Sequence, residues 1–108
     1  RDILMKNAIL TVIPSRNEAM SMVALESSSL GTPFLATKNC GLDDFQRNSS
    51  GFICEADYKS ISKNLDILLR DREYLKKIGK NSINYVYKNY TWESIIKRMS
   101  FYLDKFKN

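Results

Sequence analysis

Apolar and polar residues alternate along the chain in blocks that predict strands and helices in turn. A continuous apolar, β-branched run from Ala8 to Ile13 ends at Pro14, a pattern typical of strands that are buried on both faces of a parallel sheet. Two shorter apolar runs, Phe34–Thr37 and Phe52–Cys54, predict a second and a third strand. Each run is bounded by glycine, proline or polar residues, which favours short and well-delimited strands.

Helical periodicity fills most of the chain between and after these runs. Asn17 or Ser21 is the candidate N-cap of the first helix, and Gly31 is expected at its C′ position. Thr91 is the candidate N-cap of the last helix, in which Ile95, Ile96, Met99, Leu103 and Phe106 form the expected buried stripe. The predicted helices run from about Ser21 to Leu30, Asp43 to Arg47, Ser60 to Leu69, Asp71 onward, and Trp92 to about Phe106, with a helix end or turn over Asp2 to Asn7.

The alternating order of strands and helices favours parallel strands joined by right-handed crossovers. We therefore expect an α/β fold with a Rossmann-like, partial doubly wound parallel sheet of about three strands and flanking helices. A chain of 108 residues is long enough for one small domain with a modest core. Three strands make only half of a doubly wound sheet, so the first strand should lie at an open edge, where the isolated chain could self-associate.

Composition excludes several classes of protein. No apolar run is long enough to span a membrane, and no histidine is present to support a metal site. Cys40 and Cys54 are too few for a disulfide framework and are expected to be reduced thiols, one in a loop and one in a strand. The chain begins with Arg1 rather than methionine, which suggests a fragment of a longer protein.

The net charge of +5 arises at the C-terminal end of the chain. Residues 1–70 carry eight basic and eight acidic groups, whereas residues 71–108 carry nine basic and four acidic groups. The simplest interpretation is a solvated helix face, and peripheral contact with anionic membrane lipids is the alternative. Nucleic-acid binding is not expected, because basic and aromatic residues do not alternate along the chain as they do in known nucleic-acid-binding proteins.

Candidate chemistry is concentrated just after the first predicted strand, at the carboxyl end where open α/β sheets bind ligands. Glu18 and Glu26 lie eight positions apart, about 12 Å along a helix. This distance is similar to that between the sugar ring and the ribose of an extended nucleotide-sugar. The helix start between them offers free backbone N–H groups, which suit a diphosphate.

These residues resemble the Glu-x7-Glu motif of retaining glycosyltransferases with the GT-B fold, in the "glycosyl transferases group 1" family. The resemblance extends over nearly the whole chain, because further family landmarks follow in the expected order and spacing. They are Leu30-Gly-Thr-Pro-Phe-Leu-Ala-Thr37, Gly41-Leu-Asp-Asp44, Gly51-Phe-Ile-Cys54 and Tyr90-Thr-Trp-Glu93. One motif of this kind would be weak evidence, but five ordered landmarks are strong evidence.

The resemblance implies a role for each residue of the motif. Glu18 would contact hydroxyls of the donor sugar near the reacting carbon, as the catalytic residue, and Glu26 would bind the ribose. The backbone amides between them would bind the phosphates without a metal or other cofactor. The implied donor-binding residues are Glu18, Ala19, Met20, Ser21, Met22, Val23 and Glu26.

The resemblance also implies partners and a place in a larger enzyme. The chain would be the C-terminal part of the nucleotide-sugar-binding domain, and the first strands and the N-terminal acceptor domain would lie upstream of Arg1. An arginine and lysine pair that neutralises the diphosphate would lie there too, so this chain alone should be inactive. The acceptor would be a glycan or a lipid, and the expected location is the cytoplasm, with the inner face of the membrane as a possible site of action.

Departures from the family pattern keep other interpretations open. Ala19 and Ser21 replace glycines that would allow close backbone approach to the phosphates. Asp44 replaces a glutamate and is assigned no role, and Arg16 is interpreted as an exposed loop residue rather than a phosphate ligand. The alternatives to a transferase fragment are a truncated, non-catalytic nucleotide-binding module and a Rossmann-like interaction domain.

Overall fold

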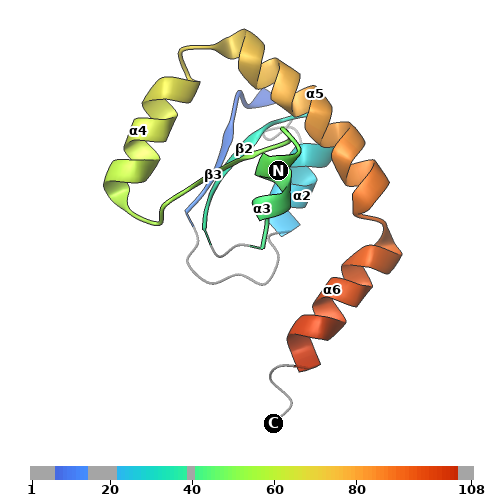
Figure 1. Cartoon of the computed structure of the whole chain (residues 1–108). Helices are drawn as coiled ribbons and strands as arrows, with labels where there is room; N and C mark the ends of the chain where they lie inside the picture. The colour runs from blue at the N-terminus through green and yellow to red at the C-terminus, as the bar shows by residue number, and fades with distance from the viewer. Residues whose placement is uncertain (1–6, 15–21, 39–40, 105–108) are drawn as a thin grey trace.

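The computed structural model describes residues 7–14, 22–38 and 41–104, with side chains for all of them except 98, 99 and 101–104 (Figure 1). The bounds of β2, α3 and β3 are those predicted from the sequence, and α2 differs from its prediction by one residue at each end. In chain order the elements are β1 (Thr11–Ile13), α2 (Met22–Ser29), β2 (Phe34–Thr37), α3 (Asp43–Arg47), β3 (Phe52–Cys54), α4 (Tyr58–Leu68), α5 (Arg72–Asn89) and α6 (Trp92–Asp104).

The three strands form one parallel sheet in the order β1-β2-β3, which confirms the predicted α/β fold. Thr11 is opposite Phe34 in the first pair, and Leu35 is opposite Phe52 in the second. The central strand β2 is buried along its whole length, as expected for a strand covered on both faces. In the described part of the chain β1 has β2 as its only strand neighbour, so it lies at the edge of the sheet as predicted.

The first strand is shorter than predicted, because pairing begins only at Thr11. The Thr11 amide donates to the Pro33 carbonyl over 2.9 Å, but proline has no N–H to donate back to the carbonyl of Ile9. The ladder therefore cannot extend toward Ala8. Ile9 and Val12 are 41% and 38% exposed, so the expectation that this strand is buried on both faces was wrong for β1.

Side chains of β2 divide the core into two clusters, one on each face of the sheet. Phe34 and Ala36 belong to the cluster covered by α2, α3 and the second half of α5. Leu35 belongs to the other cluster, which includes Leu68 of α4 and Leu75 of α5. Figure 1 shows α4 on one side of the strands and α2 and α3 on the other. Helix α5 thus contributes to both faces and joins the two halves of the core.

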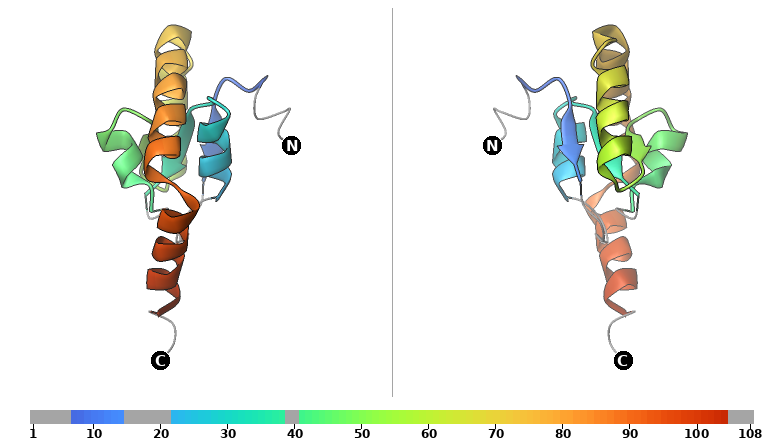
Figure 2. Two further views of the ribbon diagram at one scale, coloured as in Figure 1. Left: turned by 90° about the vertical axis from the view of Figure 1, so that its right-hand side faces the viewer. Right: turned by 90° about the vertical axis from the view of Figure 1, so that its left-hand side faces the viewer.

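The last helix extends away from the sheet, as both views in Figure 2 show. Ile95 is buried against the core, but the neighbouring Ile96 is 59% exposed, so its place in the predicted buried stripe was wrong. The side chains of Met99 and Leu103, and all of Phe106, lie outside the described residues. Among the apolar side chains of α6 that the structure describes, Ile95 packs on the core and Ile96 faces solvent.

Helix ends follow local side-chain chemistry. Asp57 Oδ1 accepts from the Ser60 amide over 2.7 Å, and α4 therefore begins at Tyr58, two residues earlier than predicted. Thr91 caps α6 as expected, since its hydroxyl oxygen accepts from the Ser94 amide over 3.1 Å. Gly31 follows α2 with a φ of 81°, which confirms its predicted C′ position.

Candidate functional site

The carboxyl ends of the three strands meet at one edge of the sheet, where β1 passes into Pro14, β2 ends at Thr37 and β3 ends at Cys54. A hollow of about 280 Å³ opens at this edge. Parallel α/β sheets bind ligands outside the carboxyl ends of their strands, so this edge is the candidate functional site. The residues that line the hollow are Pro14, Thr37, Ala56, Asp57, Tyr58 and Ile61.

A larger hollow, of about 560 Å³, lies between the end of α3 and the second half of α5. Its lining residues Asn48 and Ser50 precede β3 in the chain, which places this groove toward the amino end of that strand. Open α/β sheets bind their ligands at the opposite, carboxyl edge. We therefore take the smaller hollow at the carboxyl edge as the functional candidate, despite its size.

Most of the predicted Glu-x7-Glu site lies outside the described residues. This holds for Glu18, Ala19, Met20 and Ser21, and therefore for the predicted catalytic glutamate. The N-cap candidates Asn17 and Ser21, together with Arg16 and Cys40, are also outside. Residues 15–21 follow Pro14 directly, so in the sequence they connect the carboxyl edge of the sheet to α2.

The structure places the other predicted donor-binding residues together on α2. Met22 begins the helix and is 45% exposed, whereas Val23 is half-buried against the core. Glu26 is half-buried, and it lies four positions after Met22, which puts the two side chains on the same face of the helix. A half-buried carboxylate on this helix can accept hydrogen bonds from neighbouring hydroxyls of a ligand.

Hydrogen bonds from its neighbours fix the position of Glu26 relative to the sheet. The Ser27 hydroxyl lies 2.8 Å from the Thr32 carbonyl and 2.9 Å from the Thr11 hydroxyl, so it ties α2 to both β1 and the segment before β2. At the end of the helix, the Thr32 amide donates to the Ser27 carbonyl over 3.0 Å, and the Gly31 amide donates to the Ser28 carbonyl over 3.1 Å. These two bonds complete a Schellman motif and stop α2 one turn after Glu26.

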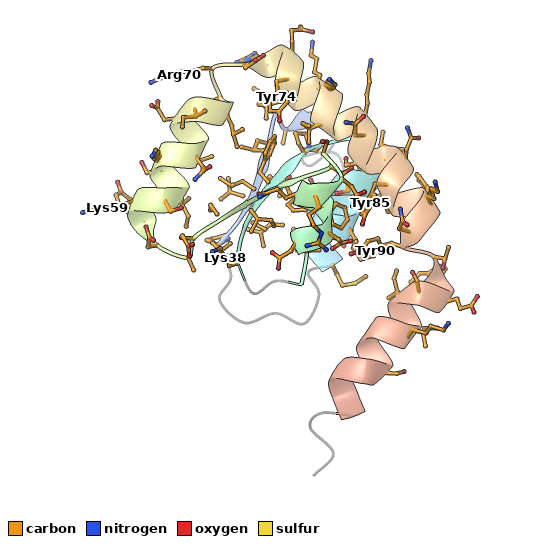
Figure 3. All side chains as sticks on the ribbon, viewed as in Figure 1. Lys38, Lys59, Arg70, Tyr74, Tyr85 and Tyr90 are labelled. Carbon is orange, nitrogen blue, oxygen red and sulfur yellow. The ribbon has the colours of Figure 1, made fainter. Side chains whose placement is uncertain are left out.

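An ion pair joins the residues that follow β2 and β3. Lys38 Nζ lies 2.5 Å from Glu55 Oε1, and both side chains are more than half exposed. The hydrogen bond to Glu55, followed by the charge of that carboxylate, raises the pKa of Lys38 above its ordinary value. Figure 3 shows Lys38 at the end of the strands. Sequence reasoning missed this pair, although the parallel alignment of Thr37 with Cys54 places the next two residues side by side.

Cys54 is buried at the end of β3 and is a free thiol. Burial raises its pKa above the ordinary value of 9.0, and the hydrogen bond with Ser60 opposes this shift. A thiol with a raised pKa is a poor nucleophile at neutral pH, since the thiolate is the reactive form. Cys54 is therefore a structural residue of this edge.

Asp44, to which sequence reasoning assigned no role, anchors α3 to α5. Its Oδ2 atom accepts hydrogen bonds from the hydroxyls of Tyr85 over 2.6 Å and Tyr90 over 2.9 Å. Figure 3 shows both tyrosines between α5 and α3, where their rings also pack on Phe45. Asp44 thereby ties the start of α3 to the C-terminal end of α5. These contacts span more than 40 residues of sequence, so no local signal could have indicated them.

Two further observations bear on the classes of site available. Among the described residues, no group of three or more histidine, cysteine, aspartate or glutamate side chains could hold a metal ion. Within those same residues, no helix has the length and hydrophobicity needed to cross a membrane.

Comparison with known families gives a match over most of the chain. The model described as "Glycosyl transferases group 1" matches residues 2–85. An uncharacterized glycosyltransferase of Methanocaldococcus jannaschii is 31% identical over 96 residues, which are 87% of this chain and 25% of that protein. The D-inositol 3-phosphate glycosyltransferase of Thermobispora bispora is 32% identical over 86% of this chain and 22% of its own length.

Two further matches agree with these. The N-acetyl-alpha-D-glucosaminyl L-malate synthase of Bacillus anthracis is 26% identical over 82% of this chain and 24% of its own length. The solved structure of sucrose-phosphate synthase from Thermosynechococcus elongatus superimposes with a TM-score of 0.78 at 24% identity, covering 96% of this chain and 27% of that one. This likeness confirms the α/β fold expected from the GT-B resemblance. The chain spans about a quarter of the length of the relatives that it matches.

Proposed function

The chain belongs to the "Glycosyl transferases group 1" family, and from this membership we propose that it forms the C-terminal part of the donor-binding domain of a retaining glycosyltransferase. The complete enzyme would transfer a sugar from a nucleotide-sugar to a glycan or lipid acceptor. The observation that carries this proposal is the position of the Glu-x7-Glu segment, which links the carboxyl edge of a parallel sheet to α2.

The donor would bind along this segment. Glu26 would accept hydrogen bonds from the ribose hydroxyls, and Glu18 would contact the donor sugar beside the bond that breaks. Backbone amides at the start of the helix, from Met20 to Val23, would stabilise the charge that builds on the leaving diphosphate. In this scheme transfer needs no metal ion or other cofactor, because the helix start supplies the positive end of a dipole.

The acceptor and the remaining donor contacts would come from upstream of this segment. A second, N-terminal domain would supply the acceptor site, and a basic pair would neutralise the diphosphate. The enzyme would act in the cytoplasm, and the basic residues of α5 would favour contact with anionic lipids at the inner face of the membrane. Arg72, Lys76, Lys77, Lys80 and Lys88 are the exposed cations of this helix.

Replacement of Glu18 and Glu26 tests the proposal, and the variants are made in the complete enzyme that would contain this chain. We expect Glu26→Ala to weaken nucleotide-sugar binding by about 5- to 150-fold, which corresponds to the loss of about 1–3 kcal/mol from one buried hydrogen-bonding partner. Glu18→Ala should mainly lower kcat. Isothermal calorimetry and steady-state kinetics measure the two effects separately.

Glu93→Ala is the matched control, since Glu93 is an exposed glutamate in the first turn of a helix and is not among the proposed donor-binding residues. It should leave both quantities unchanged. If Glu18→Ala and Glu26→Ala behave like Glu93→Ala while all three proteins stay folded, the donor-site assignment is wrong.

The 108-residue chain by itself should transfer no sugar, because the proposed acceptor site and basic pair are not part of it. An assay of the purified chain with several nucleotide-sugars and simple acceptors, with and without a chelator, measures this. Transfer that persists in the presence of the chelator would show that this chain needs neither the acceptor site nor the basic pair that the proposal assigns to upstream residues.

A further inference from the structure

We propose that the hollow at the carboxyl edge of the sheet binds an uncharged sugar ring, which stacks on Tyr58 and donates hydroxyl hydrogen bonds to Asp57. This inference rests on the proposed function, because it assigns a sugar subsite to the same edge of the sheet. It concerns residues of α4 and its N-cap, which lie outside the Glu-x7-Glu segment.

Tyr58 is exposed in a way that the fold does not explain. The side chain is 84% exposed, more than Trp92 at 75%, and it belongs to neither cluster of the core. It stands at the first position of α4 and lines the hollow together with the apolar side chains of Pro14 and Ile61. An exposed aromatic ring beside a hollow offers a flat apolar surface, on which the C–H face of a sugar ring can be buried.

Asp57 adds the polar contact that would orient such a ring. Its Oδ1 atom caps α4 by accepting from the Ser60 amide over 2.7 Å, which holds the carboxylate in place. Within the part of the chain that the structure describes, its other oxygen has no hydrogen-bond partner. A carboxylate has acceptor capacity for several donors, so this oxygen can bind one or two hydroxyl groups without disturbing the cap.

The charge of the hollow disfavours a phosphate group. Among the described residues that line it none is a lysine or an arginine, and Asp57 contributes a negative charge. The nearby Lys38 is engaged by Glu55, so it cannot compensate. A phosphate would lose its hydration and be repelled, whereas a neutral ring with hydroxyl groups would satisfy the carboxylate. The size of about 280 Å³ is slightly below the range for drug-sized ligands, which suits one ring rather than a whole nucleotide.

Titration of the ¹⁵N-labelled chain with methyl glycosides tests the proposal by NMR. The probes are the methyl α-glycosides of glucose, galactose, mannose and N-acetylglucosamine, each at millimolar concentrations. We expect at least one of them to shift the amide signals of Asp57, Tyr58 and Ile61 in a saturable manner. If none of the four does so, the proposal is wrong.

Variants separate recognition from helix capping. Asp57→Asn keeps an effective N-cap but removes the carboxylate, and we expect it to weaken glycoside binding about tenfold. Tyr58→Ala should abolish measurable binding, whereas Tyr58→Phe should retain it, because the ring supplies the stacking surface. Loss of binding in Tyr58→Phe to the same extent as in Tyr58→Ala would contradict the stacking role.

Matched controls lie on α5. Asp71→Asn changes an N-cap of the same kind, since Asp71 Oδ1 accepts from the Tyr74 amide, and Tyr87→Ala removes another exposed tyrosine. Both controls should leave glycoside binding unchanged. If the two controls weaken glycoside binding as much as the variants of Asp57 and Tyr58 do, the effect is a general loss of folding and the site assignment fails.

Competition distinguishes the source of the sugar and keeps the two proposals separate. If a nucleotide-sugar displaces the glycoside, the ring in the hollow belongs to the donor. If it does not, the hollow holds one ring of the acceptor, in addition to the acceptor site that the N-terminal domain would supply. Shifts at the hollow with a nucleoside diphosphate alone, and none with the glycosides, would overturn the sugar assignment. Glu26→Ala would still weaken nucleotide-sugar binding in that case, so the proposed function could stand without this subsite.

Discussion

The carbonyl oxygen of Gly31 occupies the space that a side chain on Gly79 would need. A Cβ atom on Gly79 would lie 2.2 Å from that oxygen and 3.2 Å from Cδ of Pro33. The contact brings α5 against the end of α2, the helix that carries Glu26. Because the obstacle is a backbone atom, no change of rotamer can relieve it, and the two helices depend on glycine for their close approach.

Gly79→Ala should therefore destabilise the chain, although alanine is the better helix former by about 1 kcal/mol. Relief of the clash requires α5 to move off α2, and we expect a net loss of about 1–3 kcal/mol in the free energy of unfolding. Urea denaturation measures the loss. Lys80→Ala, at the next and exposed position, is the control and should change stability by less than about 0.5 kcal/mol. If the Gly79→Ala protein were more stable than the control, the close contact between α5 and the end of α2 would be refuted.

Two adjacent buried serines of α2 should respond to alanine in opposite ways. The Ser27 hydroxyl donates to the Thr32 carbonyl, so Ser27→Ala should cost about 1–3 kcal/mol. The Ser28 hydroxyl is fully buried and has no hydrogen-bond partner among the described residues, so Ser28→Ala should be neutral or stabilising. Thermal unfolding of both variants compares two substitutions of identical chemistry. Equal destabilisation would show that the Ser28 hydroxyl is hydrogen-bonded in solution.

The Asp44 anchor should contribute measurably to stability. Asp44→Ala leaves the hydroxyls of Tyr85 and Tyr90 without their shared acceptor, and we expect a loss of about 1–3 kcal/mol. Asp43→Ala is the control, because Asp43 lies in the same first turn of α3 and is exposed. A double-mutant cycle of Asp44→Ala with Tyr90→Phe should give a coupling energy clearly different from zero. Additive effects would mean that the hydrogen bond contributes nothing to stability.

The open edge at β1 should make the isolated chain self-associate. Val12 is 38% exposed on this edge, and in the described residues β1 pairs only with β2. Light scattering coupled to size-exclusion chromatography should show an apparent mass that rises with protein concentration. Val12→Lys should reduce this association, because charged side chains on an edge disfavour strand pairing.

Ile96→Lys provides the comparison for the edge variant, since Ile96 is an exposed isoleucine that belongs to α6 and not to the sheet. It should leave association through β1 unchanged. A chain that stays monomeric at high concentration, or that responds equally to the two substitutions, would show that the edge does not mediate association.

The sequence by itself determined the elements whose ends are marked within a few residues. Gly31 and Pro33 place the end of α2 and the start of β2, and the alternation of strands and helices predicts the parallel sheet. The Glu-x7-Glu segment was recognisable for the same reason, because its two glutamates lie within nine residues of each other. Caps, turns and hydrophobic periods are local chemistry, so they can be read without knowledge of the fold.

Contacts between distant residues were decided only by the tertiary structure. Pro33 shortens β1 because it lies opposite that strand, and Asp44 acquires its role only when α5 brings Tyr85 and Tyr90 beside it. The hollow with Tyr58 likewise depends on the place where α4 docks against the carboxyl edge of the sheet. Such relationships depend on which surfaces meet when the core closes, and the chemistry of neighbouring residues in the chain does not specify them.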